Sequence, residues 1–276
     1  MPLFGPSVEI KLETQMSPLS EIPSPTIDLQ TLSHRFGEER VLSEISLTVA
    51  AGEFVSLIGP SGCGKSTLLR LIAGLEPIQT GALTFESAPD SPALPAEDPK
   101  RAFVFQDASL LPWRSAFANV ALPLELSGVS NTVRNEKTRQ QLLRVGLVDE
   151  DQNKLPRMLS GGMKMRVSLA RALVTDPQVL LMDEPFAALD DILRTQLNQE
   201  LLELWSQQRW TTVFVTHQIA EAAFLSDRVV VMSHHPGKVH DIIPIDLPRP
   251  RVPDLRGTHA FTEVVARLQK SLSEVV

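Results

Sequence analysis

Two stretches of this chain combine residue types and spacing that suit phosphate chemistry. The first, GPSGCGKS at residues 59–66, fits the pattern G-x-x-x-x-G-K-[ST]. An apolar run precedes it at residues 54–58, and an amphipathic segment with Leu68, Leu69 and Ile72 follows it. A glycine-rich loop between a strand and a helix turns backbone N–H groups inward, where they and the helix dipole bind phosphate oxygens. The sequence therefore predicts a phosphate-binding loop and not merely a glycine-rich turn.

Side chains of this loop extend the same chemistry. Lys65 can reach the β- and γ-phosphates of a nucleotide as a point charge, and the Ser66 hydroxyl can hold Mg²⁺. Cys63 is the only cysteine of the chain, which excludes an internal disulfide and suits a reducing compartment. No catalytic-cysteine signature surrounds it, so we expect a small filler and not a nucleophile.

The second stretch is QVLLMDEP at residues 178–185. Its continuous apolar run at residues 179–182 is typical of a strand buried on both faces. Open α/β sheets place their chemistry at the carboxyl ends of such strands, where Asp183 and Glu184 stand here. Asp183 suits a Mg²⁺ shell, and Glu184 suits the positioning of a water molecule. Helix-capping acids are the weaker explanation because both carboxylates adjoin the buried strand.

A third motif, LSGGM at residues 159–163, precedes a helical pattern. Ser160 is a plausible N-cap, so Gly161 and Gly162 would present backbone N–H groups at a helix N-terminus. The motif is therefore either a second anion site or a capped turn.

The apolar run TTVFVTH at residues 211–217 predicts another buried strand, and it ends in His217. A lone histidine at a strand end is usually structural. Next to a phosphate loop and an acidic pair, it becomes a candidate sensor of phosphate. The other five histidines show no ligand spacing with carboxylates, so we expect no metal site beyond Mg²⁺.

Strands and helices must position these motifs. Strand patterns begin at Ile27, and alternation of polarity at residues 45–49 predicts a half-buried antiparallel strand. Further strand-like runs stand at residues 81–86, 102–105, 227–233 and 238–245. Residues from about 115 to 174 are mainly helical in pattern, and a helix follows ALD to about Gln207. Three breaks interrupt the first helical region: Gly128, Gly146 and Pro156.

These patterns divide the chain into three parts. Residues 1–25 mix proline, serine and acidic residues without a period, so we expect a flexible N-terminal tail. One domain is predicted at residues 26–245, with a helical subdomain at about 107–175. A C-terminal extension with a terminal helix, residues 246–276, leaves no room for another domain.

Two aromatic residues allow two interpretations each. Phe36 ends the first strand, where it is either part of the core or a flat face for adenine. Trp113 lies in the apolar segment LLPWR, which is either a loop that covers the core or a docking surface for a partner. Periodicity does not decide between these interpretations.

Composition limits the possible classes of protein. With 276 residues, 43% of them hydrophobic and 21% charged, the chain can bury a sizeable core. Its net charge of −7 disfavours a nucleic-acid partner, which would require a basic face. No apolar run reaches the ~18 residues of a membrane helix, and the N-terminus lacks the basic start and apolar core of a secretion signal.

The phosphate loop, LSGGM, LLMDEP, ALD and a strand ending in histidine follow one another in an order and at separations that resemble an ABC transporter ATPase subunit. The resemblance covers about residues 26–245, and the combined pattern is far more specific than any single motif. It implies an α/β fold: a P-loop ABC ATPase cassette with a mixed, mainly parallel sheet as its core, an N-terminal antiparallel β part and a helical subdomain. It implies ATP and Mg²⁺ as cofactors.

The resemblance also assigns roles in ATP binding. Phe36 matches the adenine-stacking aromatic, which is more often tyrosine in the family, and this chain has no tyrosine. Gln106 matches the Q-loop glutamine that contacts Mg²⁺ and links to the membrane partner. Ser66, Gln106 and Asp183 would thus hold the metal ion. The residues that match the Walker A loop are Gly59, Pro60, Ser61, Gly62, Cys63, Gly64, Lys65, Ser66 and Thr67.

The resemblance also implies which residues take part in catalysis and in dimer contacts. Glu184 matches the catalytic base and His217 the switch histidine on the γ-phosphate, while Lys65 neutralises charge in the reaction. Asp190 matches the D-loop aspartate. Ser160, Gly161 and Gly162 match the signature motif, which contacts ATP held by the other subunit of a dimer.

One position departs from the family pattern. The signature usually continues with glutamine, and this chain has Met163. Methionine there is similar to the branch that imports nitrate, sulfonates, taurine and related small solutes, as are DASLLPWRSAFANV and HHPGKV. The change does not affect the roles of Ser160 and Gly162, because those contacts come from a hydroxyl and the backbone.

The resemblance therefore predicts the ATP-hydrolysing subunit of an importer. Its expected partners are a second copy of itself, an integral membrane permease contacted through Trp113 and, indirectly, a periplasmic or extracellular substrate-binding protein, with no nucleic acid. We expect a peripheral protein on the cytoplasmic face of the inner membrane.

Three other classes of protein are alternatives to an importer subunit. A soluble ABC-type ATPase of DNA repair or translation usually carries two cassettes or long insertions, and this chain has neither. A subunit that binds ATP without turnover would be free to lose Lys65, Glu184 and His217, which are all present. A phosphate-loop kinase would have no use for LSGGM and ALD.

Overall fold

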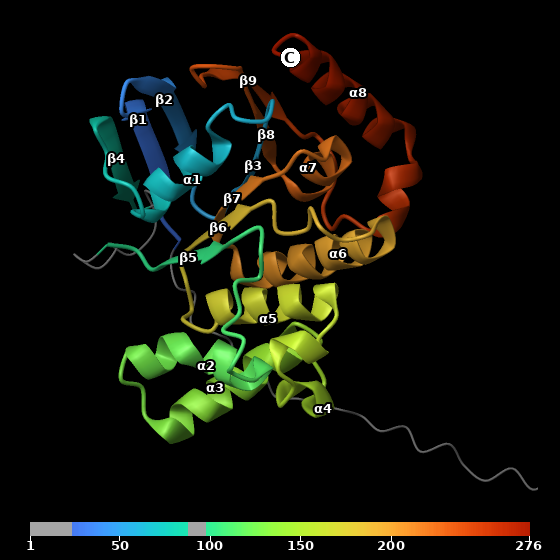
Figure 1. Cartoon of the computed structure of the whole chain (residues 1–276). Helices are drawn as coiled ribbons and strands as arrows, with labels where there is room; N and C mark the ends of the chain where they lie inside the picture. Colours follow the sequence, from blue (N-terminus) through green and yellow to red (C-terminus); the bar gives the residue numbers. More distant parts are fainter. Residues whose placement is uncertain (1–23, 88–97) are drawn as a thin grey trace, which may run out of the picture.

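The structure is a computed structural model that describes residues 24–87 and 98–276 (Figure 1). The predicted flexible tail, residues 1–25, lies almost entirely outside the described residues. The described chain forms a small antiparallel sheet, a larger mainly parallel sheet and a group of helices beside them.

The small sheet is antiparallel, as the sequence predicts, and has the strand order β2-β1-β4. Its strands are β1 (Thr26–Phe36), β2 (Glu39–Val49) and β4 (Thr80–Glu86). On β2, Ile45, Leu47 and Val49 are buried, and the residues between them are exposed. The alternating pattern of residues 45–49 is thereby confirmed.

The large sheet has the strand order β5-β6-β7-β3-β8-β9. All neighbouring strands run parallel except the last pair, β8 and β9, which is antiparallel. The strands are β3 (Phe54–Ile58), β5 (Arg101–Val104), β6 (Val179–Asp183), β7 (Thr211–Val215), β8 (Arg228–Met232) and β9 (Val239–Pro244).

Continuous apolar runs account for the central strands. Every residue of β3, β6 and β7 is buried, because each of these strands separates two apolar cores. On β6, for example, Leu180 packs into one core and Leu181 into the other. The first core includes side chains of α5 (Gly161–Leu173), and the second includes side chains of the small sheet and of α1 (Lys65–Ala73).

Between β5 and β6 the chain is helical, as predicted (lower part of Figure 1). The elements are α2 (Ala116–Leu126), α3 (Asn131–Arg144), α4 (Asp149–Gln152), the 3₁₀ turn η1 (Pro156–Met158) and α5. Each predicted break coincides with an element boundary: Gly128 follows α2, Gly146 follows α3, and Pro156 begins η1.

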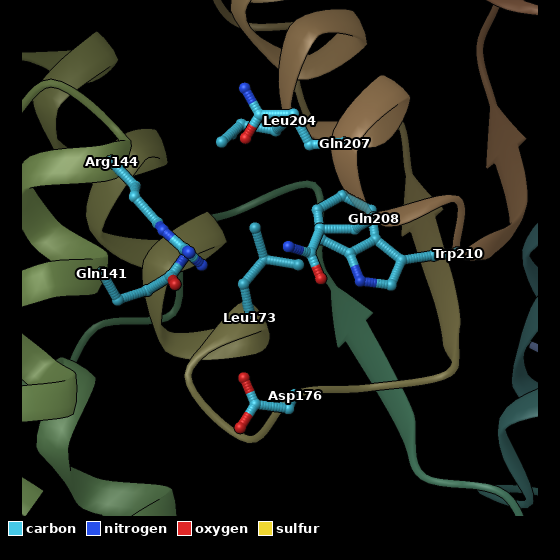
Figure 2. A pocket seen from close by; sticks show the side chains of 8 residues that line it. All are labelled: Gln141, Arg144, Leu173, Asp176, Leu204, Gln207, Gln208 and Trp210. Carbon is cyan, nitrogen blue, oxygen red and sulfur yellow. The ribbon is translucent and has the colours of Figure 1, made fainter. Parts of the chain in front are cut away.

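The helical part meets the core along a seam at the end of α6 (Asp191–Gln208). Figure 2 shows Gln141 and Arg144 of α3 facing Gln207 and Gln208 of α6 across this seam. The cavity between them has a volume of about 10 Å³, which is the space of a single water molecule. The two parts are therefore packed closely together in this conformation.

The sequence pattern does not predict α7 (Ile219–Leu225), which follows β7. The strand itself ends at Val215, two residues earlier than the run TTVFVTH indicates. Five of the seven residues of α7 are buried, so the helix lacks the polar face that would reveal a helical period.

Residues 246–276 pack against α7. They contain the 3₁₀ turn η2 (Pro253–Gly257) and α8 (His259–Ser273), whose Phe261 and Leu268 are buried. Arg251 is buried and donates hydrogen bonds to five backbone carbonyls. Its acceptors are Ala223, Phe224, Ser226, Ile245 and Leu247. None of the helices in the described ranges is both long and apolar enough to cross a bilayer.

Candidate active site

The large sheet brings four of the predicted parts of the site to one edge: the phosphate loop, Gln106, the Asp183–Glu184 pair and His217. Strands β5, β6, β7 and β3 are parallel neighbours, so their carboxyl ends meet there. The phosphate loop follows β3, and Gln106 follows β5. Asp183 is the last residue of β6, and His217 stands two residues beyond β7. This is the edge at which open α/β sheets bind ligands.

The phosphate loop ends where α1 begins, at Lys65. Gly64 caps the helix with a φ of 95°, in the left-handed region that glycine tolerates. A Cβ atom at this position would lie 2.6 Å from Cδ2 of Leu42, so the space also requires glycine. The small sheet therefore packs directly behind the start of the helix, where the backbone N–H groups are free to bind an anion.

Lys65 is only 7% exposed and is held by the loop that it follows. Its Nζ donates hydrogen bonds of 2.9 Å to the carbonyl oxygens of Gly59 and Pro60. Its charge is thus concentrated at the loop, where phosphate oxygens would bind. Cys63 is buried beside it, and burial raises the pKa of the thiol. A protonated, buried thiol has the properties expected of a filler.

Ser66 and Asp183 meet at the start of α1. The Ser66 hydroxyl donates a hydrogen bond of 2.8 Å to Oδ1 of Asp183. Burial raises the pKa of this carboxyl, and the charge of Glu184 raises it further, while the Ser66 bond and the charges of Arg70 and Lys65 oppose the shift. A buried carboxylate of this kind gains stability from a nearby cation.

This donor set fits Mg²⁺. A hydroxyl and a carboxylate are hard oxygen ligands, and the amide of Gln106 follows the neighbouring strand. Within the described ranges, no group of three histidine, cysteine, aspartate or glutamate side chains could form an all-protein metal site. Mg²⁺ does not need such a cage, because it is usually bound by one or two carboxylates, waters and substrate phosphates.

Glu184 and His217 form a second polar pair. His217 Nδ1 lies 3.2 Å from Oε2 of Glu184, and Nε2 lies 3.4 Å from Nε2 of Gln218. A neutral imidazole with its proton on Nδ1 satisfies both contacts, because it donates to the carboxylate and accepts from the amide. Glu184 has a φ of 45°, an uncommon conformation for glutamate of the kind that clusters at functional sites.

Arg194, on α6, supports the segment that follows Glu184, and the sequence patterns did not identify it. Its guanidinium donates to the carbonyl oxygens of Phe186 and Leu189. Asp190, which follows Leu189, caps α6 because its Oδ1 accepts a hydrogen bond of 3.0 Å from the N–H of Leu193. The only sequence signal for Arg194 is a basic residue in the first turn of a helix, which is too common to be diagnostic.

Ser160 caps α5, and its hydroxyl accepts a hydrogen bond from the N–H of Met163 at 3.3 Å. Gly162 is buried, and a Cβ atom there would lie 2.7 Å from Cδ2 of Leu193, so α5 and α6 can approach closely. Ser160 and Gly161 are exposed. Because α5 and α1 pack on opposite faces of the large sheet, one chain does not bring the signature motif to its own phosphate loop.

Exposure resolves the two aromatic ambiguities in part. Phe36 is 47% exposed and contacts the ring of His34 edge-on, with centroids 4.7 Å apart, so it is not a core residue. Trp113 is 73% exposed, so its loop does not bury it over the core.

Although Trp113 is exposed, hydrogen bonds from Asn119 and Arg171 fix the backbone of its loop and of the segment before it. The buried side chain of Asn119 accepts a hydrogen bond from the N–H of Leu111 and donates to three backbone carbonyls of the loop. Arg171 of α5 donates to the carbonyls of Ala108 and Ser109, between Gln106 and the loop.

Comparison with known proteins agrees with this geometry. The family model described as ABC transporter matches residues 42–187. A putative ATP-binding protein of Brucella abortus is 40% identical over 244 residues, which are 88% of this chain and 92% of that protein. The aliphatic sulfonates import ATP-binding protein SsuB of Bacillus cereus is 41% identical over 243 residues, which are 87% of this chain and 92% of that protein.

Among solved structures, a dimeric post-hydrolysis state of an ATP-binding cassette bound to ADP and Pi is similar, with a TM-score of 0.67 and 31% identity over 80% of this chain and all of that one. These similarities confirm the predicted cassette fold and support the importer branch that Met163 indicated. The chain belongs to the ABC transporter family of ATP-binding cassettes, which bind and hydrolyse ATP.

Proposed function

We propose that this chain is the ATP-hydrolysing subunit of an importer for a small solute such as a sulfonate, taurine or nitrate. The observation that carries the proposal is the convergence of two polar pairs at one sheet edge. The first pair, Ser66 and Asp183, adjoins the phosphate loop. The second pair lies beside it: Glu184 is the residue after Asp183, and His217 follows the neighbouring strand β7.

Within the site, each residue has a separate task. The phosphate loop and Lys65 bind the β- and γ-phosphates, and Phe36 stacks on adenine. Ser66, Gln106 and Asp183 would hold Mg²⁺, which would neutralise charge on the transferring phosphoryl group. The side chain of Glu184 orients a water molecule and accepts its proton as the water oxygen bonds to the γ-phosphorus and the bond to ADP breaks. His217 contacts the γ-phosphate.

The active form is a dimer of two copies. Ser160, Gly161 and Gly162 of one copy contact the γ-phosphate of ATP on the other, since α5 and α1 lie on opposite faces of the sheet within one chain. ATP therefore bridges the two copies, and hydrolysis removes the bridge. Asp190, at the start of α6, lies at the same dimer contact.

The dimer drives a separate membrane permease from the cytoplasmic face of the inner membrane. The exposed Trp113, on a loop held by Asn119 and Arg171, is the proposed permease contact. A periplasmic or extracellular binding protein delivers the solute to the permease, and this chain does not contact the solute.

The variant Glu184→Gln tests the catalytic and dimer roles together. With ATP and Mg²⁺ it is expected to bind ATP, lose about 10²-fold or more of the hydrolysis rate, and shift from monomer to dimer in light scattering. Glu203→Gln, an exposed glutamate of α6, is the matched control. Normal turnover in Glu184→Gln would remove Glu184 from its role, and a monomer under all conditions would contradict the ATP-bridged dimer.

The partner is tested by purifying the chain from native membranes and identifying what accompanies it. A multispanning permease is the expected partner, and Trp113→Ala is expected to lose it while Val252→Ala, which changes another exposed apolar side chain, retains it. A soluble DNA-repair or translation complex in place of a permease would overturn the transport role and leave the ATP site unaffected.

A further inference from the structure

The Thr216 hydroxyl links the backbone next to His217 to a buried acid, Glu221. Thr216 and Gln218 stand on either side of His217, and Oγ1 of Thr216 accepts a hydrogen bond of 2.9 Å from the N–H of Gln218. The same hydroxyl lies 2.5 Å from Oε2 of Glu221, on α7. The hydroxyl accepts from the Gln218 N–H and donates its own proton to Oε2 of Glu221, which is the acceptor of that bond.

The exposed His217 ring has few contacts of its own to orient it. Its side chain is 50% exposed, and its polar contacts in the described residues are those to Glu184 and Gln218. The backbone turn at Thr216–Gln218 therefore determines where the ring points. Thr216 is 2% exposed, so the hydrogen bonds that stabilise this turn are shielded from water.

Glu221 is an unusual residue for the interior of the protein. It is 4% exposed, although buried carboxylates are rare unless they are paired. Burial raises its pKa, while the Thr216 hydroxyl, Asn198 and the charges of Arg194 and Arg256 oppose the shift. Arg194 is also the residue that supports the segment after Glu184. The buried carboxyl is thus adjacent to supports of both members of the Glu184–His217 pair.

We propose that Thr216 and Glu221 are positioning residues for His217: the Glu221 carboxyl orients the Thr216 hydroxyl, which fixes the turn that aims the imidazole at Glu184 and the γ-phosphate. The inference rests on the proposed role of His217 in hydrolysis. It explains why a buried acid is placed on a seven-residue helix directly after the site.

Paired substitutions at residue 216 isolate the hydroxyl. Thr216→Ser keeps it, whereas Thr216→Val replaces it with a methyl group of similar size. In the full chain, Thr216→Val is expected to lower kcat for Mg²⁺-dependent ATP hydrolysis by about 10- to 100-fold, the usual effect of misplacing a catalytic group, with little change in KM. Thr216→Ser is expected to stay close to the unmodified chain.

Glu221→Gln and Glu221→Leu form a second pair that does not depend on the folding of Thr216→Val. Glutamine keeps an acceptor oxygen and should retain most of kcat, whereas leucine should lose as much as Thr216→Val. Equal kcat values within each pair would overturn the inference. A lower thermal midpoint without a change in kcat would assign both residues a purely structural role and would overturn it as well.

A double-mutant cycle separates this inference from the proposed function. In a His217→Ala background, Thr216→Val should cause no further loss of kcat, because the ring that it aims is already absent. Full activity of His217→Ala alone would contradict the role of His217 and the inference with it. If the single variant His217→Ala is inactive and the single variant Thr216→Val is fully active, the inference is overturned and the proposed role of His217 stands.

A spectroscopic readout does not require activity. The chain has six histidines, so the imidazole ¹⁵N signals of His217 can be assigned by comparison with His217→Ala. We expect Thr216→Val and Glu221→Leu to shift the His217 signals and leave the other five unchanged, and Thr216→Ser to shift none. Unchanged His217 signals in both disruptive variants would contradict the proposed positioning.

Discussion

The Ser66 hydroxyl and the Asp183 carboxylate lie 2.8 Å apart, although 117 residues separate them in the chain. A buried carboxylate next to a hydroxyl is a suitable half-site for Mg²⁺ that phosphate oxygens complete. Replacement of Asp183 by asparagine removes the negative charge and keeps the size. We expect Asp183→Asn to raise the Mg²⁺ concentration needed for half-maximal hydrolysis by about 10-fold or more.

The measurement is a Mg²⁺ titration of ATP hydrolysis at fixed ATP. Asp254→Asn, which removes an exposed carboxylate from η2, is the control for the change in net charge. An unchanged Mg²⁺ dependence in Asp183→Asn would exclude Asp183 as a metal ligand.

Lys65 supplies a nearly buried positive charge at the phosphate loop. Its replacement by alanine removes the charge-assisted hydrogen bonds to the phosphates of ATP, and bonds of this kind contribute about 1.5–3 kcal/mol each. We therefore expect Lys65→Ala to weaken ATP binding by about 10- to 100-fold and to abolish hydrolysis. Isothermal titration with ATP measures the affinity, and Lys270→Ala, an exposed lysine of α8, serves as control. Unaltered affinity would count against the role of this loop.

Glu221 should make stability depend on pH in a definite direction. Burial raises its pKa above the ordinary 4.5, so the folded chain binds the proton more tightly than the unfolded chain does. The free energy of unfolding due to this group is then fully present below pH 4.5 and declines as pH rises through the folded pKa. The Thr216 hydroxyl, Asn198, Arg194 and Arg256 face the carboxyl and limit the shift.

Denaturant unfolding of the unmodified chain and of Glu221→Gln at several pH values measures this effect. The stability of the unmodified chain relative to Glu221→Gln should fall with increasing pH. A relative stability that rises with pH would mean that Arg194 and Arg256 lower the pKa more than burial raises it.

Arg251 should contribute strongly to stability because it satisfies carbonyls at the end of α7 and in the segment before η2. Burial lowers the pKa of its guanidinium to about 10, and the charge of Arg249 adds to this shift while that of Asp227 opposes it. We expect Arg251→Met to lower the free energy of unfolding by about 2–4 kcal/mol, since buried acceptors lose a charged donor. Arg267→Met, at an exposed position of α8, is the control. A loss below 1 kcal/mol, which is about the value of one ordinary hydrogen bond, would contradict this assignment.

The sequence alone was sufficient where apolar runs end in reactive side chains. The runs before Gly59 and after Gln178 are buried on both faces in the structure, so the strand and its functional end could be predicted together. By contrast, α7 could not be predicted, because a short buried helix has no polar face. Glu221 was missed for that reason.

Other features depend on the tertiary arrangement alone. The exposure of Phe36 and Trp113 is set by which elements pack next to them, and local patterns do not contain that information. Arg194 shows the same limit. Its bonds to Phe186 and Leu189 exist only because α6 folds back against the preceding segment.

The two ends of α5 have different neighbours, so the helix is a rigid connection between two separate parts of the molecule. Its first turn carries Ser160 as the cap, which in the proposed dimer faces the nucleotide of the other copy. Its last turn carries Arg171, whose guanidinium is bonded to the chain just before Trp113. A 13-residue helix is a rigid rod about 20 Å long. In the proposed dimer, closure of the two copies at one end of α5 would therefore displace the Trp113 loop at the other end, because the helix moves as a rigid body.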